Sequence, residues 1–219
     1  MKKAFEKLLI KLPNESGILG NRNYFKSVVL MPFVLIDGEY QILFEKRANH
    51  IRQGGEVSFP GGGFDAENDK NYQETAIRET CEELGLKSSD ITIHKQFDTV
   101  VVPHGNMIFT FLGEIDSNAF KRIEVNHKEV EYVFTVPLNW FLENEPEIYH
   151  TRSQMFPYII DDNGDKQTTF PAKDLGVPEK YSKPWGNKLY PVYVYQINGE
   201  IIWGITGQII FELMNLLSS

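Results

Sequence analysis

Apolar runs alternate with polar, glycine-containing segments along the chain, and this pattern predicts interleaved strands and helices. Two pairs of β-rich runs have hairpin signals at Asp37-Gly38 and Asn198-Gly199. The first pair is KSVVLMPFVLI and YQILFEKR, and the second is LYPVYVYQI and EIIWGI. Further strands are predicted in EVSF, ITIHKQFDTVVV, MIFTFLGEI and EVEYVFTV.

Four segments have the pattern or the end signals of helices. MKKAFEKLLIKLP predicts an amphipathic helix ended by Pro13, and residues 72–84 predict a helix followed by Gly85, where glycine favours a left-handed C-cap. LNWFLEN follows Pro137, and TGQIIFELMNLL follows the second hairpin with Thr206 as its candidate N-cap. The chain is therefore predicted to have a mixed α/β (α+β) fold.

The length of 219 residues and a hydrophobic content of 42% fit one domain spanning residues 1–219. Residues 1–20 are expected to form an N-terminal helical extension. Residues 161–187 are rich in Pro, Gly, Asp and Lys, which predicts an irregular insertion. Loops of this length usually have a role, and this one is expected to form either a lid or a dimer contact. A homodimer is therefore one of the expected states.

A formal net charge of −8 argues against nucleic acid as a partner, because phosphate binding needs clustered cations. The N-terminal segment lacks the pattern of a secretion signal, and it fits packing on its own domain better than a membrane role. Cys81 is the single cysteine, so no intramolecular disulfide forms, and it is interpreted as a small buried hydrophobe. These features lead us to expect a cytoplasmic protein with neither a nucleic acid nor a membrane partner.

Three carboxylates gather on one face of the helix predicted at 72–84. At about 100° per residue, Glu82 lies about 60° to one side of Glu79 and Glu83 about 40° to the other. The opposite side is formed by Ala76, Ile77, Thr80, Cys81 and Leu84. Like charges at this spacing repel, and a hard divalent cation such as Mg²⁺ or Mn²⁺ would reverse the sign of that interaction.

A solvated helix face explains such a run of Glu residues equally well. The glycines 61–63 favour the metal interpretation, because residues without a β-carbon let backbone groups approach a ligand closely. Arg78 stands four residues after Glu74 and four before Glu82, where its guanidinium can orient carboxylates.

The same stretch resembles the signature of the Nudix hydrolases, which ends in R-E-U-x-E-E-x-G-U, where U is apolar. The matching residues are Arg78, Glu79, Thr80, Cys81, Glu82, Glu83, Leu84, Gly85 and Leu86, and only Thr80 departs from the apolar preference. Asp69 takes the place of the acidic residue in the first half, one residue further from Arg78 than is usual, and the loop around it is interpreted as a tolerant connector. The resemblance implies a Nudix-type α/β/α sandwich with a mixed sheet, and metal-dependent hydrolysis of a diphosphate bond.

The segment LFEKRANHIRQGGEVSFPGG resembles the one that precedes the signature in coenzyme A pyrophosphatases. The matching positions are Arg47, Arg52, Gly55, Glu56, Val57, Phe59, Pro60, Gly61 and Gly62. EVEYVFTVPL and IIWGITGQII are also similar to later blocks of that branch. The resemblance implies hydrolysis of coenzyme A or acyl-CoA to 3′,5′-ADP and (acyl-)phosphopantetheine.

The resemblance also assigns roles to residues. It implies metal ligands in the Gly61 carbonyl, Glu79, Glu82 and Glu83, and it counts Arg78 among the catalytic residues. Either Glu82 or Glu83 would take the proton from water, with Glu129 as the other contender. For Glu129, an ordinary edge-strand acid is the alternative.

Arg47 and Arg52 are predicted to bind phosphates through bidentate guanidinium donors. Surface ion pairs with Glu45 or Glu56 are the alternative. His50 and His104 are not assigned catalytic roles, because an isolated loop histidine is commonly a polar surface residue. The aromatic residues Trp185, Tyr193, Tyr195 and Trp203 fit core positions better than stacking on an adenine.

Two other functions stay open. Within the same class, ADP-ribose or a dinucleotide is an alternative small-molecule nucleotide diphosphate substrate. From a different class, the chain is a catalytically silent module that senses a nucleotide. The retained helix carboxylates and Arg78 favour the enzyme.

Overall fold

The computed structural model describes residues 2–14, 17–102 and 105–218, so His104 lies outside the described residues. The chain forms two compact units. The first unit contains Met1–Leu35 and Phe59–Asn126, and the second contains Ile36–Ser58 and His127–Ser219. Each unit takes two separate stretches of the chain, so neither is a continuous segment of the sequence.

The first unit is built on a mixed sheet. Its strands are β1 (Phe25–Ile36), β4 (Gly61–Gly63), β5 (Ile91–Val102) and β6 (Asn106–Ile115). β1 runs parallel to β6 and antiparallel to β4, and β5 is antiparallel to β6. The helices are α1 (Lys2–Lys11), α2 (Tyr72–Leu84) and α3 (Ser117–Phe120), with 3₁₀ turns η1 (Asn21–Asn23) and η2 (Ser88–Asp90). Fully buried side chains include Val28, Leu30, Met31, Val34, Ala76, Leu84 and Ile115.

Helix α2 has the bounds that the sequence predicted. The Asn71 side chain accepts a hydrogen bond from the Glu74 backbone N–H at 3.0 Å, which caps the first turn. Gly85 has φ of 65°, so the predicted left-handed C-cap is confirmed. A β-carbon at Gly85 would lie 2.5 Å from the Glu124 carbonyl oxygen, so close packing also requires glycine there.

Helix α1 forms where the sequence predicted it, before Pro13. Its apolar residues Phe5, Leu8 and Leu9 are each more than half exposed. The packing of this helix on its own domain, which the sequence favoured, is therefore not seen in the described residues. No helix in residues 2–14, 17–102 and 105–218 is long and apolar enough to cross a membrane.

The second unit contains three groups of strands. β2 (Glu39–Arg47) pairs antiparallel with β3 (Val57–Ser58) and with β7 (Val130–Pro137). β11 (Trp185–Ile197) pairs with β8 (Glu147–Met155) and with β12 (Glu200–Ile202). β9 (Tyr158–Ile160) pairs with β10 (Lys166–Thr168). The helices are α4 (Leu138–Glu143) and α5 (Gly204–Ser218), with the 3₁₀ turn η3 (Glu179–Ser182).

Aromatic packing forms part of the core of this unit. Phe141 lies 6.0 Å from Phe44 and 5.3 Å from Tyr195, measured between ring centroids. Tyr195 is 2% exposed, which confirms a core position for this residue, whereas Trp203 is 45% exposed. The core interpretation is therefore wrong for Trp203.

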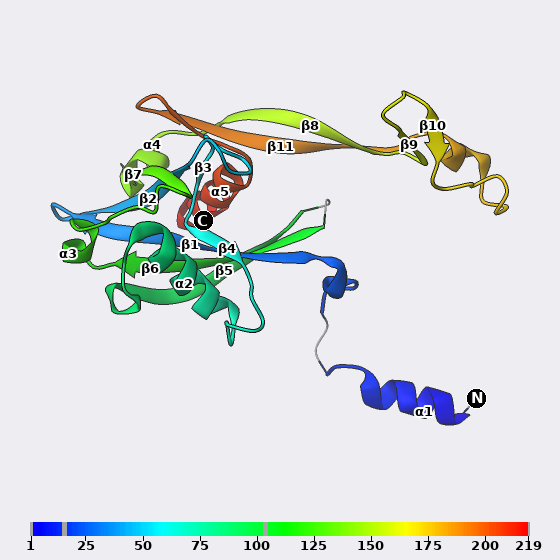
Figure 1. Cartoon of the computed structure of the whole chain (residues 1–219), viewed down its shortest axis with the longest axis horizontal. Helices are drawn as coiled ribbons and strands as arrows, with labels where there is room; N and C mark the ends of the chain where they lie inside the picture. Colours follow the sequence, from blue (N-terminus) through cyan, green and yellow to red (C-terminus); the bar gives the residue numbers. More distant parts are fainter. Residues whose placement is uncertain (1, 15–16, 103–104, 219) are drawn as a thin grey trace. The chain divides into compact units, whose positions relative to one another are not determined.

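Strands β8 and β11 form a long two-stranded ribbon that carries β9 and β10 at one end (Figure 1). The stretch predicted as irregular, residues 161–187, contains β10 and η3, and its last three residues already belong to β11. The insertion therefore has local structure of its own. We refer to residues 156–184 as the tip.

Thr206 is not an N-cap, contrary to the sequence prediction. Helix α5 begins at Gly204, and Thr206 lies within its first turn. Its side chain is buried, and its hydroxyl donates to the Val57 carbonyl at 3.2 Å. A contact between residues far apart in the sequence has replaced the local cap.

Gly85→Ala is expected to destabilise the protein, because it adds both backbone strain at positive φ and a clash with the Glu124 carbonyl. The free energy of unfolding, measured by urea denaturation, should fall by roughly 2 kcal/mol. Gly164→Ala is the matched control, because Gly164 has φ of 86° and open space around its Cα. An equal loss in the two variants would contradict the packing role of Gly85.

Candidate active site

The glycine run and the carboxylate helix come together in the first unit. Gly61–Gly63 is itself a strand, β4, which pairs with β1 in the register Val29↔Gly61 to Ser27↔Gly63. A β-carbon at Gly61 would lie 2.1 Å from the Val28 carbonyl oxygen. Only glycine therefore allows this approach to β1, and the strand in turn lies against α2.

Glu79 lies directly over this glycine strand. A β-carbon at Gly62 would lie 2.3 to 2.5 Å from the carboxylate atoms of Glu79. No side chain other than hydrogen fits between the strand and this carboxylate. The sequence suggested that glycine allows close approach, and the group that approaches Gly62 is Glu79.

Glu83 is buried, with 2% of its surface exposed. Its Oε2 accepts a hydrogen bond from the Gly61 backbone N–H at 2.8 Å. A buried carboxylate needs such donors, because loss of hydration is costly. The amide of Gly61 and the side chain of Glu83 thus link β4 to the last turn of α2.

Asp69 and Arg78 form a bidentate ion pair beside these carboxylates. Arg78 Nε donates to Asp69 Oδ1 and Nη2 donates to Oδ2, both at 2.9 Å. The Thr75 hydroxyl and the Asp65 backbone N–H also donate to Oδ2, at 2.9 and 3.2 Å. The hydrogen bonds from Arg78 lower the pKa of Asp69 from 3.8 to about 2, and the same contact raises the pKa of Arg78.

Asp69 is therefore not part of a tolerant connector, contrary to the sequence interpretation. It is 6% exposed and holds the guanidinium of Arg78 in place. The sequence signal was present, since an acidic residue stands near the position that the Nudix signature reserves for one. The extra loop residue obscured its structural role.

The other side of the Arg78 guanidinium contacts two helix carboxylates. Arg78 Nη1 lies 3.0 Å from Glu79 Oε1 and 3.2 Å from Glu82 Oε2. The positive charge offsets part of the repulsion that the sequence pattern implied. Of the two acids that the spacing placed beside Arg78, Glu82 does contact it, whereas Glu74 contacts Lys70 at 3.5 Å. The Glu82 side chain is 55% exposed, so the solvated alternative describes this residue in part.

The burial of α2 differs from the prediction at three positions. Glu83 belongs to the buried side, whereas Ile77 and Cys81 are half-buried. Cys81 is thus not the buried hydrophobe that the sequence suggested, although desolvation raises the pKa of its thiol and argues against a nucleophilic role. Thr80, the one departure from the apolar pattern, is also buried. Its hydroxyl tolerates burial because it donates a hydrogen bond to the Ala76 carbonyl at 2.7 Å.

Arg47 belongs to the second unit and pairs with a carboxylate there. Its Nη1 lies 3.6 Å from Oε1 of Glu45, which is fully buried and also accepts a hydrogen bond from Ser58 at 2.9 Å. The ion-pair alternative therefore describes Arg47. The sequence offered little sign of this buried acid beyond its position directly after the apolar residues Ile42, Leu43 and Phe44.

Arg52 and Glu129 are also in the second unit, and both side chains are exposed. The Arg52 carbonyl accepts a hydrogen bond from Arg47 Nε at 3.4 Å. Glu129 immediately precedes β7, and its carbonyl accepts from the Ala48 N–H at 2.8 Å. Glu129 therefore adjoins a strand without being part of it. His50 lies in an exposed turn.

The donors in the first unit suit a hard divalent cation, since they are carboxylate and carbonyl oxygens. Three carboxylates contact the Arg78 guanidinium, which leaves an excess of two formal negative charges; the acids are Asp69, Glu79 and Glu82. Glu83 is held separately, by the Gly61 amide. Within the described residues, however, no three His, Cys, Asp or Glu side chains are already grouped in a geometry that could hold a metal ion. The oxygen atoms of these side chains are of the type that binds such a cation. In this structure the same oxygens accept hydrogen bonds or ion-pair contacts from N–H groups of Arg78 and Gly61.

The NUDIX domain family model matches residues 28–159, more than half of the chain. The chain therefore belongs to the Nudix family. This match, together with the mixed sheet and the helices, confirms the predicted fold class.

Relatives with known names agree with this assignment. The chain is 37% identical over 193 residues to Nudix hydrolase 3 of Caenorhabditis elegans, a match that covers 87% of this chain and 72% of that protein. It is 32% identical to the peroxisomal coenzyme A diphosphatase of Mus musculus and 30% identical to the mitochondrial coenzyme A diphosphatase of Homo sapiens. These two matches cover 58% and 56% of this chain and about half of each relative, 52% in both cases. The protein is accordingly an enzyme, a Nudix pyrophosphohydrolase.

Asp69→Asn is expected to lower the free energy of unfolding at pH 7 by about 2 kcal/mol, because it removes a charge-assisted pair. The folded-state pKa of Asp69 is depressed to about 2, so the stabilisation is present above pH 4 and is lost as the pH falls toward 2. Urea denaturation between pH 3 and pH 7 should therefore show the wild type converging on the variant at low pH. Glu67→Gln, an exposed acid in the same loop, should change neither curve, and a pH-independent gap for Asp69→Asn would contradict the assignment.

Gly62→Ala is expected to displace the Glu79 carboxylate, because the added β-carbon overlaps it. A misplacement of about 1 Å can cost about 100-fold in rate, so pyrophosphohydrolase activity should fall by that order while circular dichroism shows a folded protein. Gly63→Ala is the control, since its β-carbon meets only the exposed ring of Phe25, at 3.1 Å. Equal activity in the two variants would show that the position of Glu79 does not matter.

Proposed function

We propose that this enzyme hydrolyses the diphosphate bond of a nucleoside diphosphate linked to another moiety, with Mg²⁺ or Mn²⁺ as cofactor. The observation that carries the proposal is that Glu79 and Glu83 lie against the glycine strand, while Glu79 and Glu82 both contact the Arg78 guanidinium. An excess of negative charge is unfavourable by itself, so this group is suited to binding positive ions.

The residues that would hold the cation are Glu79, Glu82, Glu83 and the Gly61 carbonyl. When bound, the ion neutralises diphosphate charge and lowers the pKa of a bound water. The chain itself fixes the positions of these ligands. Arg78 and Gly62 limit where the Glu79 carboxylate can lie, and the Gly61 amide holds the Glu83 carboxylate. Such preorganisation reduces the reorganisation that accompanies the reaction.

A carboxylate of the same group would take the proton from the attacking water. Glu82 has the access to solvent that this role requires, since its side chain is 55% exposed. Glu83 is held in a buried position, which suits a ligand better than a group that exchanges protons with solvent. Glu129 stays an alternative base, and the single variants Glu82→Gln and Glu129→Gln would separate the two roles.

Coenzyme A or an acyl derivative is the substrate that we favour. The two diphosphatase relatives are named for coenzyme A, and the segment around Arg47, Arg52 and Gly55–Glu56 resembles that branch. In the second unit, Arg47 is tied to this segment by two backbone hydrogen bonds, from Gly55 N to Arg47 O and from Arg47 N to Glu56 O, both at 2.9 Å. Arg52 is exposed, so its guanidinium is accessible to a phosphate.

The alternative substrates within the same class are ADP-ribose and dinucleotides. Purified protein with Mg²⁺ or Mn²⁺ should be incubated with coenzyme A, ADP-ribose, NADH, diadenosine polyphosphates and nucleoside triphosphates, and the products identified. We expect 3′,5′-ADP and phosphopantetheine from coenzyme A as the fastest reaction. Faster cleavage of ADP-ribose or a dinucleotide would overturn the substrate assignment but leave the reaction class intact.

The Glu82→Gln, Glu83→Gln double variant is expected to lose metal-dependent turnover by at least about 100-fold while remaining folded, because it removes two charged oxygen donors. Chelation of the metal by EDTA should abolish wild-type turnover, and excess Mg²⁺ should restore it. Glu124→Gln, an exposed acid that follows α3, is the matched control and should keep its activity. Undiminished turnover in the double variant would refute the proposed site.

A further inference from the structure

Strand β8 is the outer strand of its sheet. The strand order is β12-β11-β8, so among the described residues no strand pairs with the edge of β8 that faces away from β11. The strand is nine residues long, and every residue in it except Ser153 is exposed. An edge of this kind presents unpaired backbone N–H and C=O groups over about 30 Å, which is enough for pairing with another strand.

The other edge of the ribbon, formed by β11, is protected against such pairing. It contains Pro191, which lacks an N–H donor, and Lys188, and its register with β8 shifts between Trp185 and Lys188 because β11 has an extra residue there. Proline, lysine and bulges are common devices that keep sheet edges from pairing. The sequence of β8, EIYHTRSQM, contains neither proline nor lysine. One edge of the ribbon is therefore protected, and the edge of β8 is open.

Exposed apolar side chains lie at both ends of β8, and polar side chains lie in its middle. Ile148 and Tyr149 at one end are 51% and 54% exposed, and Met155 and Phe156 at the other end are 56% and 52% exposed. Residues 150–154 between them are all polar, with the sequence HTRSQ. This pattern is similar in both directions, so two antiparallel copies of β8 would match apolar ends with apolar ends. A twofold axis between two copies of the chain produces that arrangement.

The charge of β8 also suits a contact between two copies. The strand has one acidic and one basic residue, Glu147 and Arg152, so its formal charge is balanced although the chain carries −8. The Glu147 carboxylate is already bound within its own ribbon, because Gln196 Nε2 donates to it at 3.0 Å. A large net charge keeps proteins apart, so two copies of an acidic chain meet most easily at a neutral surface.

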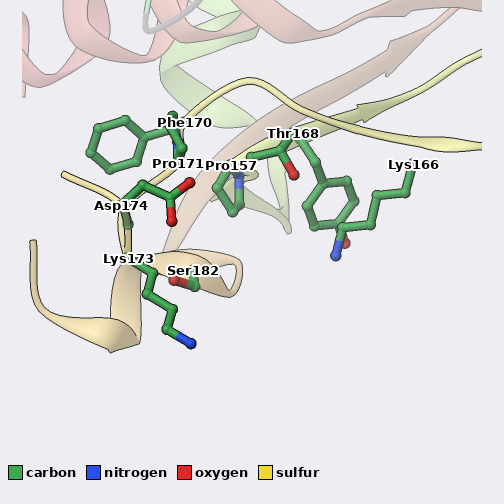
Figure 2. Close-up of a pocket in the computed structure, with 10 residues that line it drawn as sticks. Pro157, Lys166, Thr168, Phe170, Pro171, Lys173, Asp174 and Ser182 are labelled. Carbon is green, nitrogen blue, oxygen red and sulfur yellow. The ribbon is translucent and has the colours of Figure 1, made fainter. Parts of the chain in front are cut away.

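The tip, which follows β8, does not present a concentrated charge that would oppose this contact. Figure 2 shows Lys166, Lys173 and Asp174 apart from one another around a cavity of about 330 Å³ in the tip. The Lys166 ammonium lies 3.7 Å from the centroid of the Tyr158 ring, within the tip itself. Dispersed charges of both signs repel a like surface less than a patch of one sign does.

We propose that β8 pairs antiparallel with β8 of a second copy of this chain and joins the two ribbons into a four-stranded sheet. A two-stranded ribbon is marginal in water, whereas three or more strands with an apolar face are stable. β12 pairs with β11 at residues 195–197, so the ribbon before that point gains its further strands from the second copy. This inference goes beyond the hydrolase function and does not rest on it.

Full overlap of the two β8 strands defines the register. It places Thr151, the middle residue of β8, opposite the same residue of the partner on the twofold axis, and such Thr pairs stabilise sheets. Tyr149 then lies diagonal to Met155 of the partner subunit, and Ile148 lies diagonal to Phe156 of the partner subunit. Large side chains reach each other across such diagonals, so the exposed apolar ends cover one another.

The test is sedimentation velocity of the full-length chain over a range of concentrations up to about 100 µM, where we expect a reversible dimer. Thr151→Lys should weaken dimerisation by at least about tenfold, because it places two like charges directly opposite each other. Asn187→Lys is the matched control, since it adds the same charge at an exposed position of β11, and it should change the dimer Kd by less than about twofold. Circular dichroism shows whether both variants are folded.

Two further measurements locate the contact. Hydrogen exchange in the wild type should show the backbone N–H groups of residues 147–155 becoming more protected as the protein concentration rises, and it needs no variant. Thr151→Cys in a Cys81→Ser background should form an intermolecular disulfide on oxidation, because the register brings the two side chains together. Asn187→Cys in the same background is the control and should remain a free thiol.

Each of the other outcomes overturns the proposal in a defined way. A chain that stays monomeric at about 100 µM does not pair with itself, and the edge of β8 is then left for a strand of a different protein. A dimer whose affinity is unchanged by Thr151→Lys uses another surface. The Glu82→Gln, Glu83→Gln double variant should dimerise like the wild type whether or not turnover is lost, so the failure of one proposal is distinguished from the failure of the other.

Discussion

The bidentate pair of Arg78 and Asp69 is the interaction on which the geometry of the site depends. Two guanidinium nitrogens are committed to Asp69 in the loop, and this leaves Nη1 directed at Glu79 and Glu82 on the helix. Nη2 also reaches the Gly63 carbonyl at 3.4 Å. One planar group therefore ties together the loop, the helix and the glycine strand, and a lysine with its single ammonium could not replace it.

The glycine strand imposes a second constraint, which is steric. Gly61 and Gly62 let the backbone approach β1 on one side and the Glu79 carboxylate on the other. The amide of Gly61 then holds Glu83, so two of the three helix carboxylates are positioned by main-chain features of a strand only three residues long. The third, Glu82, is exposed, and its ion-pair partner among the described residues is Arg78. This difference in restraint gives chemically identical side chains different capacities for ligation and proton transfer.

Local signals in the sequence predicted much of the fold, and long-range contacts account for what they missed. The bounds of α2, the cap at Gly85 and the hairpin of β11 and β12 follow from periodicity and turn residues, which act over a few positions. Thr206 has the sequence features of an N-cap, but its hydroxyl donates to Val57, 149 residues away in the chain. Likewise the helical projection grouped Glu83 with the exposed acids, because it carries no information about the Gly61 amide. The charged residues of the site were identifiable from spacing, whereas their burial and partners depended on which strand lay beside the helix.

The tip raises a different question of stability. A two-stranded ribbon is marginal in water, and the segment beyond it has only a small core around Ala172 and Trp185 with which to offset its conformational entropy. A segment selected for stability alone would gain from pairing the Ser182 hydroxyl or from replacing it with an apolar group. Neither has happened, so this buried hydroxyl is a local cost that the packing around Ala172 and Trp185 has to offset.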